Sequence, residues 1–167
     1  MFLTGAFSFI VGQALPTITP KERTVKLIAS NRSARHEYFI VDEIEAGVVL
    51  KGTEVKSLRA GKVQLTGGFA RVYDNELWLE NVHISAYKEG TIFNQEPTRR
   101  RKLLLHKKEL TKLAAKLATK GITMVPLSIY FKGNKVKVLL GIAKGKKSYD
   151  KRETIKARDV KREMDRE

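Results

Sequence analysis

The sequence predicts one mostly β domain with inserted helices, followed by a basic C-terminal tail. Its 167 residues are close to the roughly 150 expected for one domain. Short β-rich runs separated by turn residues recur between residues 38 and 142, as in a small barrel or sheet. Beyond residue 142 large apolar side chains become sparse, so we do not expect that segment to add to the core. The hydrophobic content of 42% is sufficient for one core.

The first predicted elements lie between residues 25 and 62. Residues 38–41 and 47–50 are short β-rich runs, which predict two strands. Thr53 is suited to cap the start of a helix, and Gly61 is suited to end it. Apolar spacing in this helix predicts that three cations lie on its exposed side: Lys56, Arg59 and Lys62.

Two hairpins and a second helix complete the predicted domain. Asp74-Asn75 predicts a tight turn between residues 69–73 and 77–79, and Gly133-Asn134 predicts another between 124–131 and 136–142. Leucines at helical spacing predict a helix over 109–120, ended by Gly121. About six short strands with inserted helices favour an oligonucleotide-binding (OB) type six-stranded β-barrel over residues 25–142, with an open α+β sheet as the alternative.

The two ends of the chain differ from this domain. Residues 1–15 are apolar and uncharged, too short to span a bilayer and without the positive start of a secretory signal. We expect residues 1–24 to be an extension outside the domain, with a targeting segment as the alternative. Residues 143–167 contain helix formers but few apolar anchors. They predict a flexible basic tail that is disordered alone and helical when bound, with an ordinary frayed helix as the alternative.

The net charge of +15 is concentrated late in the chain and indicates a polyanionic partner. Residues 1–96 hold eleven basic and eleven acidic residues, whereas residues 97–120 hold nine basic residues and one acidic residue. This clustering is typical of a nucleic-acid footprint, in which phosphate contacts release counterions. A solvated basic surface without a partner is the alternative.

Three basic segments are candidates for RNA contact. The run containing Arg99, Arg101 and Lys102 precedes three leucines, so the cations are expected to reach phosphates while the leucines anchor the segment. His106 and Lys107 begin a second run. Planar side chains before the first long strand could stack on unpaired bases: Arg32, Arg35 and His36. Ordinary solvated charge is the alternative for each.

Patterns that would carry covalent chemistry are not found in the sequence. The absence of cysteine excludes disulfides, cysteine-based zinc sites and a thiol nucleophile. There is no phosphate-binding glycine loop, and the three histidines do not form a metal-binding pair at helical spacing. The acidic group of Asp42, Glu43 and Glu45 lacks a second carboxylate cluster to hold a metal. We therefore expect no enzyme, cofactor or metal.

Several collinear motifs together resemble the small protein B (SmpB) family from about Val25 to the C-terminus. They are Asn31-Arg-Ser-Ala-Arg-His36-Glu-Tyr-Phe39, Glu45-Ala-Gly47, Gly52-Thr-Glu-Val-Lys56-Ser-Leu-Arg59-Ala-Gly-Lys62, Glu96-Pro-Thr-Arg99-Arg-Arg101-Lys102-Leu-Leu104-Leu-His106 and Gly145-Lys146-Lys147-Ser-Tyr149-Asp150-Lys151-Arg152. Residues 1–24 lie outside the resemblance.

The resemblance implies a cytoplasmic RNA-binding protein of bacterial trans-translation. Its barrel would bind the tRNA-like domain of tmRNA (SsrA RNA), and elongation factor Tu would be an indirect partner through tmRNA. Its tail would enter the empty mRNA channel of a stalled ribosome and become helical near the decoding centre. Carried over by position, the RNA contacts are Asn31, His36, Glu45, Leu104 and His106, supported by nearby cations, and the ribosome contacts are Gly145, Lys146, Lys147, Tyr149, Asp150, Lys151 and Arg152.

Tyr149 and Glu45 need separate interpretation, and two other functions remain as alternatives. Some relatives carry His where this chain has Tyr149, so stacking is retained but titration is lost. Glu45 would be repelled by phosphate, so we expect it to accept hydrogen bonds from base amino groups or to orient a nearby arginine. The alternatives are a general single-stranded RNA-binding or ribosomal OB protein, and a nuclease with an unrecognised site.

Overall fold

The computed structural model describes residues 25–147 together with Ile155, Asp159 and Met164. The elements in chain order are β1 (Val25–Ser30), α1 (Ala34–Glu37), β2 (Tyr38–Val48), α2 (Gly52–Arg59), β3 (Val63–Gln64), β4 (Phe69–Tyr73), β5 (Glu76–Glu80), β6 (His83–Ile84), the 3-10 helix η1 (Thr91–Phe93), β7 (Arg101–Leu104), α3 (Lys107–Leu117), β8 (Ile122–Lys132) and β9 (Lys135–Gly145).

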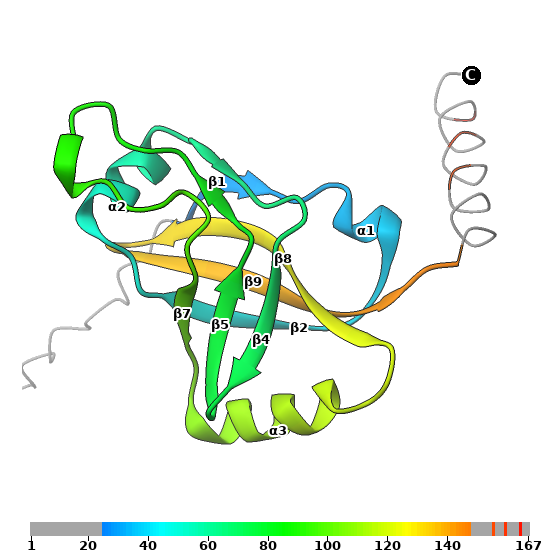
Figure 1. Cartoon of the computed structure of the whole chain (residues 1–167). Coiled ribbons are helices and arrows are strands. Elements are labelled where there is room, and N and C mark those ends of the chain that lie inside the picture. The colour runs from blue at the N-terminus through cyan, green and yellow to red at the C-terminus, as the bar shows by residue number, and fades with distance from the viewer. Residues whose placement is uncertain (1–24, 148–154, 156–158, 160–163, 165–167) are drawn as a thin grey trace, which may run out of the picture.

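Six strands close into a ring, which confirms the predicted OB-type barrel. The strands pair in the order β8-β4-β5-β7-β2-β9, and the long β8–β9 hairpin closes the circle (Figure 1). Every pairing is antiparallel, and β1 adds to β8 outside the ring. The junctions between the hairpins are short: Ala70 pairs with Met124, and Gly47 and Val48 pair with Leu104 and Leu103. The open-sheet alternative is therefore wrong.

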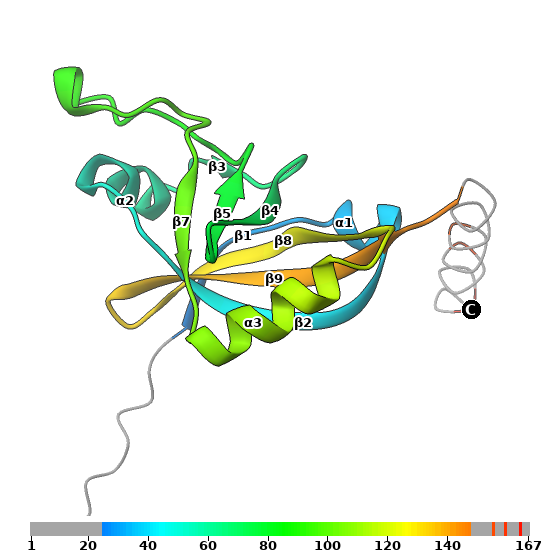
Figure 2. The same cartoon turned by 60° about the horizontal axis from the view of Figure 1, so that its bottom comes forward.

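The barrel interior is apolar because alternate residues of each strand point inward. Leu77, Leu79, Val138 and Leu140 are each at most 1% exposed, and they belong to one continuous core. α3 covers one end of the barrel, at the bottom of Figure 1, and buries Leu113 in that core. α2 lies near the opposite end, as Figure 2 also shows. Burial of this surface is the main source of the domain's stability.

The turn residues adopt the backbone conformations that the sequence predicts. Asp74 and Asn75 both have positive φ, 47° and 58°, which matches the right-handed twist of the hairpin that they close. Gly61 follows α2 with a φ of 71°, a conformation that glycine adopts without steric cost. Both predicted hairpins are confirmed as β4–β5 and β8–β9.

Several local expectations need correction. The two predicted strands over 38–50 are one eleven-residue strand, β2, because its acidic residues are at least partly exposed and do not interrupt pairing with β9. α2 begins at Gly52, with Lys51 and not Thr53 as its N-cap, because Glu54 accepts a hydrogen bond from the Lys51 N–H at 2.8 Å. Residues 31–36, for which the sequence predicted no regular element, contain the start of α1.

The boundary between domain and tail also shifts. β9 continues to Gly145, which pairs with Tyr38, so the strand ends three residues later than the predicted 142. The sequence analysis located strands by their large apolar side chains, and residues 143–145 have none, so the end of β9 was missed. The expectations for residues 1–24, and those for Tyr149, Asp150, Lys151 and Arg152, fall outside the described residues.

Candidate nucleic-acid interface

A surface groove forms where β2 meets β7, and it joins three of the expected RNA contacts. The groove has a volume of about 630 Å³ and is lined by Glu43, Ile44, Glu45, Leu104, Leu105, His106, Glu109 and Lys137. Gly47 pairs with Leu104, and a Cβ at Gly47 would lie 3.3 Å from the Leu104 Cβ. Glycine thus permits the close approach of the two strands. The Leu104 side chain remains 52% exposed at the groove.

Glu45 holds polar side chains of the β8–β9 hairpin beside this groove. Its carboxylate accepts hydrogen bonds from the Tyr130 hydroxyl and from Lys132 Nζ, the latter at 3.1 Å, and Lys137 Nζ lies 3.8 Å away. The hydrogen bond from Tyr130, assisted by the lysines, lowers the pKa of Glu45, so the carboxylate is ionised at neutral pH. Burial, followed by the bond to Glu45, raises the pKa of Tyr130 to about 12.

These contacts change the interpretation of Glu45. The cations it orients are the lysines 132 and 137, not an arginine, so that part of the hypothesis is wrong. Its role as an acceptor for base amino groups stays a prediction. Sequence reasoning missed Tyr130, Lys132 and Lys137. Their spacing of two along the strands, at positions alternating with buried residues, was the available signal.

The cations next to the groove are presented by α3. His106 is the N-cap residue, and its backbone N–H donates to Glu109 Oε2 at 3.2 Å. His106 and Lys107 are both exposed. Lys116, a basic residue near the end of α3, has a structural partner, because its Nζ lies 2.6 Å from Asp42 Oδ2. The contact of His106 and Lys107 with a polyanion near the groove stays a prediction, and their exposure is compatible with it.

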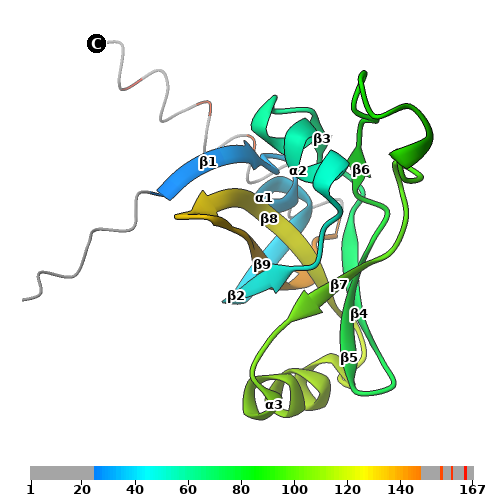
Figure 3. The ribbon, with the colours of Figure 1, turned by 90° about the vertical axis from the view of Figure 1, so that its left-hand side faces the viewer.

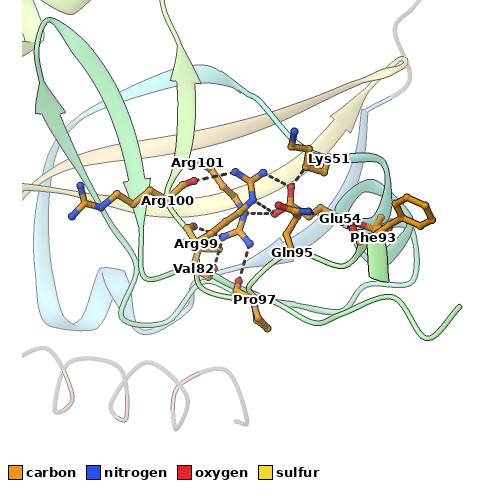
Figure 4. A network of polar contacts seen from close by, with 10 residues as sticks. Lys51, Glu54, Val82, Phe93, Gln95, Pro97, Arg99, Arg100 and Arg101 are labelled. Carbon is orange, nitrogen blue, oxygen red and sulfur yellow. Dashed lines mark hydrogen bonds and ion pairs between the residues drawn. The ribbon is translucent and has the colours of Figure 1, made fainter. Parts of the chain in front are cut away.

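Arg101 is corrected from a phosphate contact to a buried structural residue (Figure 4). It is 0% exposed, and its guanidinium donates to Glu54 Oε1 at 2.8 Å and to the carbonyls of Val82 and Pro97 at 2.6 and 2.8 Å. Arg99 donates to both oxygens of the same carboxylate. Side chains alternate along β7, with Arg101 and Leu103 inward and Lys102 outward. This alternation could have predicted that Arg101 is buried, but the sequence analysis considered only the number of charges.

The Glu54 network ties three segments together at the top of the barrel. Burial alone would raise the pKa of Glu54, but hydrogen bonds from Arg99, the Lys51 N–H and Arg101 outweigh burial and lower the pKa. Burial lowers the pKa of Arg101. The network fixes α2 against the segment that leads into β7. Lys56, Arg59 and Lys62 are exposed, as expected, and Lys56 Nζ lies 5.0 Å from the centre of the Tyr87 ring.

A second basic cluster lies around α1, at the other end of β2. Arg32 and Arg35 are exposed, and Arg35 forms an ion pair with Glu43 at 2.9 Å; His36 is partly buried. Asn31 is only 9% exposed. Its amide donates to Pro126 O and more weakly to Leu65 O, and its oxygen accepts from Ser33 Oγ and the Ala34 N–H. Asn31 thus orders the start of α1, and its expected RNA contact has little free surface.

The beginning of the tail is placed beside this second cluster, which the sequence did not reveal. Lys146 donates its backbone N–H to Glu37 O, its Nζ lies 3.1 Å from Arg35 O, and the same Nζ lies 4.7 Å from the centre of the Phe39 ring. Gly145 is the last residue of β9. The strand from Tyr38 to Glu45 is about 23 Å long at 3.3 Å per residue. The ion pair of Arg35 with Glu43, which lines the groove, links the second cluster to the groove.

Within residues 25–147 and the three described tail positions, no group of three or more His, Asp or Glu side chains is arranged to hold a metal ion. No helix among those residues is both long enough and apolar enough to cross a membrane.

Comparison with known proteins agrees with this geometry. The family model described as SmpB protein matches residues 28–167. The SsrA-binding protein of Limosilactobacillus reuteri is 58% identical over 146 residues, covering 87% of this chain and 93% of that protein. The SsrA-binding protein of Enterococcus faecalis is 56% identical over 141 residues, covering 84% and 92%.

A solved structure is also similar. It is described as "tmRNA-SmpB: a journey to the center of the bacterial ribosome", is 58% identical in sequence, and matches with a TM-score of 0.61 over 72% of this chain and 85% of that chain. The family match spans the barrel, the groove around Glu45 and Leu104, and the tail. On these matches, the chain belongs to the SmpB protein family.

Proposed function

We propose that this chain binds the tRNA-like domain of tmRNA and delivers it to stalled ribosomes for trans-translation. The observation that carries this proposal is the groove between β2 and β7, where exposed Leu104 lies beside Glu45, His106 and Lys137. An apolar contact surrounded by hydrogen-bonding and cationic groups suits a folded RNA, whose shape and exposed bases are recognised together. The relatives named SsrA-binding protein support the same RNA.

In this proposal the groove at one end of β2 binds tmRNA, and the tail that leaves the sheet at the other end contacts the ribosome. The groove grips the tRNA-like domain, with Glu45 accepting hydrogen bonds from base amino groups and the cations of α2 and α3 meeting phosphates. The chain from the end of β9 onward enters the empty mRNA channel and becomes helical near the decoding centre. Its proposed contacts are Gly145, Lys146, Lys147, Tyr149, Asp150, Lys151 and Arg152. The protein works in the cytoplasm, meets elongation factor Tu only through tmRNA, and performs no covalent chemistry.

Leu104→Ser tests the groove, because a half-exposed side chain can be changed with little effect on folding. Loss of one apolar contact of about 1.5 kcal/mol lowers affinity for the tRNA-like domain about tenfold. Leu27→Ser is the matched control, since Leu27 is 60% exposed on β1, away from the groove. Equal affinity of the two variants in a mobility-shift titration would contradict the proposed site.

Selectivity separates this function from general RNA binding. The wild-type complex with the tRNA-like domain should resist competition by an unrelated hairpin RNA of the same length. Equal competition would favour a general RNA-binding protein. Glu45→Arg tests the acceptor role: if it binds the tRNA-like domain as tightly as the wild type, Glu45 does not receive base amino groups.

A further inference from the structure

Trp78 lies between two cations on the outer face of β4, β5 and β7. Its neighbours Leu77 and Leu79 are each 1% exposed and point into the barrel, so Trp78 points outward. The register pairs Trp78 with Arg71 on one side and Lys102 on the other. Paired residues of antiparallel strands share one face of the sheet, so the indole is flanked by both cations. Figure 3 shows the three strands side by side at the lower right.

Aromatic rings and cations also alternate along this face. The Arg71 guanidinium carbon lies 4.9 Å from the centre of the Phe69 ring, and its Nη1 lies 3.4 Å from Tyr73 Oη. The Arg100 guanidinium carbon lies 5.6 Å from the Tyr73 ring. The Tyr73 residue is 38% exposed and the Arg100 side chain 67%, so this part of the series is open to solvent.

The face also carries two carboxylates. Glu76 forms an ion pair with Lys102, and Glu80 forms one with Arg100 at 3.4 Å. Three cations against two carboxylates leave the face positive. The ion pairs hold the cations in place beside the rings.

This combination matches what unpaired nucleotides need. Bases stack on exposed aromatic rings with little dependence on sequence, while nearby cations attract the phosphates. Guanidinium groups add stacking surfaces of their own. The face is continuous with the groove already described, since Lys102 lies two residues from Leu104 on the same side of β7.

We propose that the outer face of β4, β5 and β7 is a second RNA-binding surface, which holds unpaired nucleotides of single-stranded RNA by stacking beside Trp78, Tyr73 and Arg71. This inference rests on the proposed function for the class of partner, but it assigns a different surface and a different RNA structure. The competing explanation is purely structural, because cross-strand pairs of this kind also stabilise a sheet.

The chain's one tryptophan is Trp78, so its fluorescence reports on this face alone. The full chain, saturated with the tRNA-like domain, is titrated with a short oligoadenylate. We expect saturable quenching of Trp78, with affinity reduced about fivefold or more in Arg71→Gln and in Tyr73→Ser, the lower end of what one base stack contributes. Lys26→Gln, an exposed cation on β1, should bind the oligonucleotide as the wild type does.

Two results would overturn the second surface: no saturable quenching in the chain saturated with the tRNA-like domain, or wild-type affinity in both variants. Thermal unfolding of each variant is measured in parallel. Variants that unfold earlier yet bind the oligonucleotide normally would assign the series to sheet stability. A wild-type chain that fails to shift the tRNA-like domain in a gel would overturn the proposed function instead, whatever the tryptophan reports.

Discussion

Replacing Glu54 by Gln removes the carboxylate that Arg99 and Arg101 share, while the shape of the side chain is preserved. Arg101 is 0% exposed, so its charge cannot return to water and retains only neutral acceptors, the backbone carbonyls and the amide oxygen of the replacement side chain. Removing one partner of a buried ion pair costs about 3–5 kcal/mol. Arg99, whose side chain is 23% exposed, regains some hydration. We therefore expect Glu54→Gln to lower the free energy of unfolding by about 3 kcal/mol, toward the low end of that range.

Urea denaturation at neutral pH measures this loss, and the melting temperature should fall by roughly 10 °C. Asp42→Asn is the control: its partner Lys116 and Asp42 itself are about half exposed, so breaking that solvent-screened pair should change the free energy of unfolding very little. A loss below about 1 kcal/mol for Glu54→Gln would refute the assignment of this network as a major support of the fold.

The pH dependence gives a second check. Because the folded pKa of Glu54 lies below its ordinary value of 4.5, its contribution to stability is fully present above pH 4.5 and is lost as the pH falls through the folded pKa. The difference between wild type and Glu54→Gln should therefore narrow below pH 4.5. A constant difference down to strong acid would contradict the lowered pKa.

Other perturbations test separate features. Ending the chain at Lys147 keeps β9 whole, so affinity for the tRNA-like domain should stay within a few-fold while tagging is lost; lost RNA binding would contradict the division between barrel and tail. Asn31→Ala leaves buried groups unpaired and should cost about 1–3 kcal/mol in denaturation, whereas unchanged stability would place its role at the RNA. In alkaline absorbance titration, Tyr130→Phe should remove the tyrosine step at about pH 12. Since that pKa is raised from 10, the stability Tyr130 contributes is present below pH 10 and lost toward about pH 12. If the step that Tyr130→Phe removes lies near pH 10 instead, the bond to Glu45 is contradicted. Finally, log affinity for the tRNA-like domain should fall steeply with log salt, and full affinity at high salt would indicate stacking and shape in place of phosphate contacts.

The sequence predicted the local parts of the fold because their signals are local. Asp74-Asn75 and Gly133-Asn134 determine where the two hairpins turn, and alternation determines which strand residues enter the core. Closure of the barrel depends on distant pairings, such as Ala70 with Met124, that have no local signature. The number of short strands and the inserted helices favoured a barrel but left an open sheet as the alternative, and the resemblance to a known family implied the same barrel.

The site was predicted unevenly for similar reasons. Leu104 and Glu45 were identified through motifs, and only the pairing of β2 with β7 explains why they share a groove. Composition treated Arg101 as one more surface cation, because its partner Glu54 is 47 residues away. If Lys102 and Leu104 point outward, strand alternation places Arg101 inward. The position of Arg101 in a run of three arginines drew attention to its charge and away from this alternation.

β2 has a consequence for how the molecule could sit between two large RNAs. One continuous strand joins the groove at Gly47 to the point at Tyr38 where the last residue of β9 leaves the sheet. An extended backbone is almost inextensible, so β2 fixes a length of about 30 Å along the strand between the two attachment points. Inserting two residues into β2 would preserve which side chains face the core. It would lengthen the strand between the groove and the end of β9 by about 7 Å while leaving the residues at both places unchanged.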